Sequence, residues 1–191
     1  MEAKVRITSV LGAEPVSAHY LREHLRLSQD MASPEYLDGL IAAAREWVED
    51  RTWLTLREVE AEVTLDEFPR NAKAIDIPLS PLNSVTSLQY RDTDGDLVTL
   101  DPEDYEVDTV SIPPRVVPVD GWPSTGTGVN VVRLTVRAGY TDAPQKLKQA
   151  MLLLGGHWFE HREEVVVGTS VIPVPLAAMD LCDSVNRRAA S

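Results

Sequence analysis

Residues 144 to 164 read PQKLKQAMLLLGGHWFEHREE, and this stretch organises the interpretation of the whole chain. Pro144 suits the first turn of a helix, because a backbone N–H is not needed there. The spacing of the apolar residues predicts one buried helical face, formed by Leu147, Ala150, Met151, Leu154 and Trp158. Leu152, Leu153 and Phe159 make further faces apolar, so the helix must be covered on several sides, by its own fold or by a partner subunit.

Two adjacent glycines lie inside this predicted helix. Gly155 and Gly156 each cost about 1 kcal/mol of helix stability relative to alanine. The pair therefore predicts that another segment approaches the helix closely at this point.

The first part of the chain predicts two helices after an extended or loose lead-in. Ser17 can cap a short helix that carries Leu21 and Leu25 one turn apart. Ser33, followed by a proline and a glutamate, can cap a second helix that ends near Thr52. The apolar stripe of this second helix is Leu37, Leu40, Ile41, Ala44 and Val48.

The period changes from helical to alternating after Thr55. Apolar residues alternate with glutamates and a threonine over residues 58 to 65, which predicts a strand with one buried face. Asp94-Gly95, between two alternating runs, predicts a β-hairpin turn. Residues 129 to 138 form the strongest predicted strand.

These elements predict an α+β chain with a mainly helical core and an inserted antiparallel β unit, in one compact domain. Its parts are a lead-in (1–16), a helical pair (17–54), the β insertion (55–140), a central long helix (141–164), and an extended arm with a C-terminal helix (165–191).

Composition restricts the function. The net charge of -12 argues against an autonomous nucleic-acid binder, since binding to phosphates relies on Lys and Arg. A lone cysteine, Cys182, cannot form an intramolecular disulfide. No apolar run reaches the roughly 20 residues of a membrane span, so we expect a soluble protein made in the cytoplasm, with no membrane contact. The sequence carries no P-loop or dinucleotide fingerprint, and we expect no cofactor.

Two local patterns each have a functional and a structural interpretation. His157, Glu160 and His161 fit H-x-x-E-H, in which two histidines hold zinc and the glutamate acts on water. A third ligand is not evident in the 30 residues that follow, which favours histidines used in packing or at an interface. Residues 92 to 108 contain eight acids and no Lys or Arg. They form either a solvated face or, as the functional alternative, a docking surface or a lining that keeps phosphate at a distance.

Several motifs together resemble the head-tail connector family of tailed bacteriophages and prophages. They are LREHLRL in the first helix, SPLNSVTSLQYRDTDGD in the β region, a later WP, and VRLTVRAGYTDAPQKLKQAMLLLGGHWFEHREEVVVG. The resemblance covers about residues 17 to 188. Its most specific part runs from the AGY and the following proline through KQA to the helix that ends in HW, an aromatic residue and HRE.

The resemblance implies a non-enzymatic virion protein at the head-tail junction. Such an adaptor forms a ring of about twelve copies between the portal protein and a tail-side head-closure protein, and double-stranded DNA passes through without specific binding. The implied subunit or partner contacts lie on the central helix and the arm after it, with candidates Leu152, Leu153, Gly155, Gly156, Trp158, Phe159, Arg162, Val165, Val166 and Val167. The alternatives are a zinc-dependent hydrolase and a small acidic interaction module.

Overall fold

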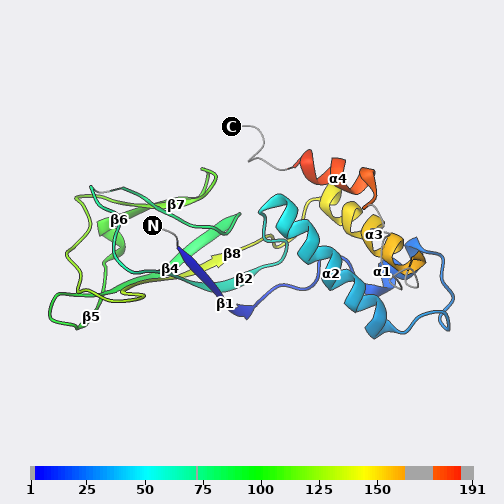
Figure 1. Cartoon of the computed structure of the whole chain (residues 1–191), viewed down its shortest axis with the longest axis horizontal. Helices are drawn as coiled ribbons and strands as arrows, with labels where there is room; N and C mark the ends of the chain where they lie inside the picture. The colour runs from blue at the N-terminus through cyan, green and yellow to red at the C-terminus, as the bar shows by residue number, and fades with distance from the viewer. Residues whose placement is uncertain (1–2, 72, 162–173, 186–191) are drawn as a thin grey trace, which may run out of the picture. The chain divides into compact units, whose positions relative to one another are not determined.

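The chain folds into two compact units. The computed structural model describes residues 3–71, 73–161 and 174–185. Among these residues, those within 1–12 and 57–141 form one unit, and those within 13–56 and 142–191 form the other. Figure 1 shows that the first unit holds the β-strands and that the second holds the α-helices. Each unit is therefore built from two segments that are distant in the sequence.

A five-stranded antiparallel sheet forms the larger part of the β unit. Its strands, in spatial order, are β1 (Lys4–Val10), β2 (Val59–Leu65), β8 (Val132–Ala138), β4 (Leu82–Arg91) and β5 (Leu97–Thr99). The predicted hairpin at Asp94-Gly95 is confirmed, because β4 and β5 pair in antiparallel register and Gly95 has a φ of 92°. The Asp92 side chain accepts hydrogen bonds from the backbone N–H groups of Asp94 and Asp96, which fixes the turn.

A second, three-stranded sheet completes the β unit. Its strands, in order, are β3 (Ile75–Asp76), β7 (Arg115–Pro118) and β6 (Tyr105–Asp108), and a 3-10 turn, η1 (Pro102–Asp104), precedes β6. One buried apolar cluster draws on both sheets, including Leu88 and Leu134 from the larger and Val116 from the smaller. At its edge the rings of Phe68 and Trp122 stack 4.7 Å apart.

The helical unit contains α1 (Ala18–His24), α2 (Pro34–Thr52), α3 (Gln145–Glu160) and α4 (Leu176–Asp183). The predicted caps are confirmed: Ser17 Oγ accepts a hydrogen bond from Tyr20 N, and Ser33 Oγ accepts one from Tyr36 N. Among the helices in the described residues, none has both the length and the apolar composition that a membrane crossing needs.

The prediction of a mainly helical core is wrong. The described residues form eight strands in two antiparallel sheets beside four helices, so the chain is α+β with a β unit that has its own core. The predicted lead-in of residues 1 to 16 contains β1, which pairs with β2. The β unit is thus completed by the N-terminal strand, through a pairing that no local pattern reveals.

Candidate functional site

The predicted central helix, α3, is covered largely by its own chain. It packs against α1, α2 and α4 within the helical unit. The predicted face is buried at Leu147, Ala150, Met151 and Leu154, while Trp158 is half-buried. Leu152, on another face, is also buried at 1% exposure. The apolar residues on several faces are therefore explained in part by three neighbouring helices.

The glycine pair lies where the first helical segment crosses α3. A Cβ atom on Gly155 would lie 3.2 and 3.3 Å from the two terminal carbons of Leu21, and one on Gly156 would lie 3.1 Å from Leu25 Cδ2. The predicted close approach is confirmed, and the approaching segment belongs to the same chain. The two glycines therefore admit the leucines of the α1 segment without any partner subunit.

Gly155→Leu is expected to destabilise the helical unit by about 2 kcal/mol, because the larger side chain would have to displace Leu21, which is fully buried. Urea unfolding followed by helical circular dichroism measures the loss. Gly39→Ala in α2 is the matched control, since a Cβ there meets nothing within 4 Å and should gain up to about 1 kcal/mol. Equal stability of Gly155→Leu and the unaltered chain would contradict this packing.

The other predicted contact residues have different surroundings. Leu153, Trp158 and Phe159 are half-buried, and the Phe159 ring centre lies 6.2 Å from that of Tyr36 in α2. Leu152, Gly155 and Gly156 are buried. The remaining candidates, Arg162, Val165, Val166 and Val167, lie outside the described residues. Leu153, Trp158 and Phe159 thus stay predicted contact residues with partly accessible side chains.

The H-x-x-E-H stretch forms the last turn of α3. The imidazole centres of His157 and His161 lie 4.4 Å apart, and His161 Nδ1 is 2.8 Å from the carbonyl oxygen of His157. An open hollow of about 320 Å³ beside this turn is lined by residues 24–26 and by α3 residues that include His157 and Glu160. Within the residues that the structure describes, no three His, Cys, Asp or Glu side chains gather closely enough to hold a metal ion.

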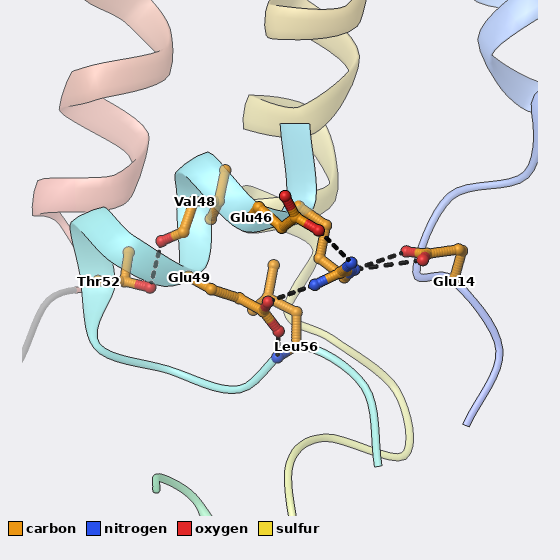
Figure 2. Close-up of polar contacts among 7 residues, drawn as sticks. Glu14, Glu46, Val48, Glu49, Thr52 and Leu56 are labelled. Atoms are coloured by element: carbon orange, nitrogen blue, oxygen red, sulfur yellow. Dashed lines mark hydrogen bonds and ion pairs between the residues drawn. The ribbon is translucent and has the colours of Figure 1, made fainter. Parts of the chain in front are cut away.

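A buried arginine lies at the centre of an ion-pair cluster in the helical unit. Arg45, in α2, is only 6% exposed. Its guanidinium Nε lies 3.0 Å from Glu14 Oε2, Nη2 lies 3.3 Å from Glu46 Oε1, and Nη1 pairs with Glu49. Figure 2 shows Glu14, Glu46 and Glu49 gathered around these ion pairs.

The arginine cluster ties three parts of the chain together. Glu14 precedes α1, Arg45 and Glu49 lie in α2, and the second oxygen of Glu49 accepts a hydrogen bond from Leu56 N at 2.7 Å, where the chain leaves the helical unit (Figure 2). Burial opposes the charge on Arg45, but the carboxylates of Glu49 and Glu14 outweigh it and raise the pKa of the guanidinium. Arg45 is therefore a permanent positive charge at a structural junction.

No family model matches this sequence, and no curated protein matches it either. Comparison with solved structures gives a different result. A chain from the virion of the native gene transfer agent particle matches with a TM-score of 0.76 and 22% identity, over 94% of this chain and 93% of that one. This chain has the fold of a gene transfer agent particle chain.

Two further matches come from structures of the gene transfer agent neck. A chain in the neck of the empty particle, computed with C6 symmetry, has a TM-score of 0.77 and covers 96% of this chain and 95% of that one. A chain in the neck of the native particle, computed with C12 symmetry, has a TM-score of 0.65 and covers 97% and 95%. Both are 22% identical to this chain. The likeness spans both units and establishes the fold.

Proposed function

We propose that this chain is a non-enzymatic structural protein of a virion neck, a head-tail adaptor that forms a ring of about twelve copies. The observation that carries the proposal is the shared fold: nearly the whole chain matches chains from gene transfer agent necks. The symmetries of those neck structures, C6 and C12, favour a ring, and so does the sequence resemblance to phage connectors.

The ring would join the portal protein to a tail-side head-closure protein. Its location would be the head-tail junction of the virion, after synthesis in the host cytoplasm. DNA would pass through the ring without specific binding, and the net charge of -12 supports this, because a strongly acidic protein does not hold phosphates. Leu153, Trp158 and Phe159 on α3 are the proposed contact residues within the described part of the helical unit.

Loss of the chain is expected to stop assembly after head filling. A deletion strain should accumulate heads without attached tails, because the portal would lack the surface that receives the tail-side protein. Electron microscopy counts tailed and tailless particles, and a plasmid copy of the gene should restore tailing. Normal tailed particles from the deletion strain would contradict the proposal.

The zinc alternative is tested in the same strain. A His161→Gln copy should restore tailing as well as the unaltered gene, since the adaptor needs no metal chemistry at the end of α3. Failure of His161→Gln to restore tailing, together with stoichiometric zinc in the purified unaltered chain, would favour the hydrolase instead.

A further inference from the structure

The strand β1 is an edge strand with an uncovered apolar face. Within the described strands it pairs only with β2, at one end of the five-stranded sheet. Val5, Ile7 and Val10 stand opposite Val63, Ala61 and Val59, which are buried. The three β1 residues therefore lie on the core side of the sheet, yet they are 39%, 54% and 48% exposed.

The register irregularity in β1 preserves this face. The pairing shifts between Ile7 and Ser9, and the shift brings Val10 back to the core side opposite Val59. Without it, the period of two would turn Val10 toward the polar side. The local geometry thus aligns three apolar side chains at the edge, where the core of the chain itself does not cover them.

The other side of β1 is basic. Lys4 and Arg6 stand opposite Thr64 and Glu62, and their side chains are 58% and 72% exposed. Arg6 Nη2 contacts one oxygen of Glu62 at 3.2 Å, and Arg133 Nε, from β8, contacts the other at 3.2 Å. Arg6 therefore shares its acidic partner and keeps most of its surface in solvent.

The opposite edge of the same sheet, β5, is acidic. The turn before it carries Asp92, Asp94 and Asp96, and residues 101 to 104 after it contain three more acids and no basic residue. Leu97, within β5, is 56% exposed, but it stands opposite Arg91 and so lies on the polar side of the sheet, while Val98 lies on the core side opposite Tyr90. One sheet thus ends in an edge with a basic side and an apolar side, and in an acidic edge.

We infer that β1 docks against the β5 edge of a second copy of this chain, so that the sheets continue from subunit to subunit. Two β1 edges would place Lys4 and Arg6 near like charges, and two β5 edges would do the same with aspartates, so charge favours the head-to-tail pairing. A contact between two different surfaces is also the type that closes into a ring. This inference rests on the proposed ring and adds the surfaces that hold it together.

Cross-linking with full-length cysteine variants tests the pairing. A Ser9→Cys/Thr99→Cys double variant, treated with a flexible bis-maleimide, should give a ladder of multimers on a denaturing gel. A mixture of the two single variants should give only dimers, and each single variant alone should stay monomeric. The unaltered chain is the control, because burial raises the pKa of the Cys182 thiol to about 11 and keeps it unreactive.

A charge variant tests the surfaces without cysteines. Arg6→Gln should weaken self-association by roughly tenfold in light-scattering titrations. Salt at 1 M should weaken self-association of the unaltered chain in the same way, since it screens charges beyond about 3 Å. Arg133→Gln is the matched control: it loses a pair with the same Glu62 but lies on an inner strand, and should associate normally.

Dimers from either single variant, or no ladder from the double variant, would overturn the edge pairing. Equal weakening by Arg6→Gln and Arg133→Gln would overturn it as well. Electron microscopy of the chain bound to portal protein separates this failure from failure of the proposed function. Rings without edge cross-links would refute the pairing alone, and the absence of rings would refute the adaptor itself.

Discussion

Arg45→Met is expected to lower the free energy of unfolding of the helical unit by about 3–5 kcal/mol, the usual cost of removing one partner from a buried ion pair. Arg45 is 6% exposed and contacts three carboxylates. Methionine fills much of the same space, so the loss of stability comes from unpaired glutamate carboxylates and not from a cavity. Glu14 and Glu49 would keep their negative charges without a counter-charge in a partly buried position.

Urea unfolding followed by helical circular dichroism measures this loss. Arg51→Met is the matched control on the same helix, because the Arg51 pair with Asp183 is more exposed to solvent and should contribute far less to stability. Adding Glu14→Gln and Glu49→Gln to Arg45→Met should recover a large part of the stability, since the uncompensated charges are then gone. A similar loss for Arg45→Met and Arg51→Met would show that the buried cluster contributes no more to stability than an exposed ion pair.

Gly139→Ala is expected to destabilise the β unit by more than about 3 kcal/mol. Gly139 has a φ of 101°, a conformation that costs a non-glycine residue about 1–3 kcal/mol. A Cβ atom there would also overlap the carbonyl oxygen of Arg57. The backbone cannot shift freely, because Gly139 N–H donates to Pro81 O at 2.8 Å and Asn83 Nδ2 donates to Gly139 O at 3.0 Å.

Trp122 packs against the core of the β unit, so its fluorescence, in a background where Trp122 is the sole tryptophan, reports this unfolding. Gly95→Ala is the control for backbone strain alone: its φ is 92°, but a Cβ there meets nothing within 4 Å, so about 1 kcal/mol should be lost. The difference between the two variants isolates the overlap with Arg57. Equal losses would mean that the backbone near Gly139 relaxes without cost.

The sequence predicts those features whose signal is local. The serine caps, the stripe of α2 and the Asp94-Gly95 turn each depend on residues within a few positions of one another. The structure confirms the caps, the turn and most of the stripe, of which Leu40 alone is half-buried. The glycine pair also predicted a close approach correctly. The residues around the glycine pair do not show which segment approaches, because Leu21 and Leu25 lie over 130 residues earlier in the chain.

The features that sequence patterns missed depend on distant partners. β1 has no buried residue and an interrupted alternation, and its partner strand, β2, begins about 50 residues later. Because local patterns do not reveal this pairing, they predict the β unit as an insertion in a helical core. The position of Arg45 in the sequence does indicate its role: it falls between Ala44 and Val48 on the buried stripe, one turn before Glu49. An arginine on an apolar stripe indicates a buried ion pair, although Glu14 could not be named from spacing.

We propose that this chain builds a ring in the neck of a virion. Single-particle electron cryomicroscopy of particles that carry a tagged copy of the chain tests it most directly. We expect a closed ring of about twelve copies at the head-tail junction, with density that fits both units of the fold. Tagged particles whose neck contains no copy of the chain would contradict it.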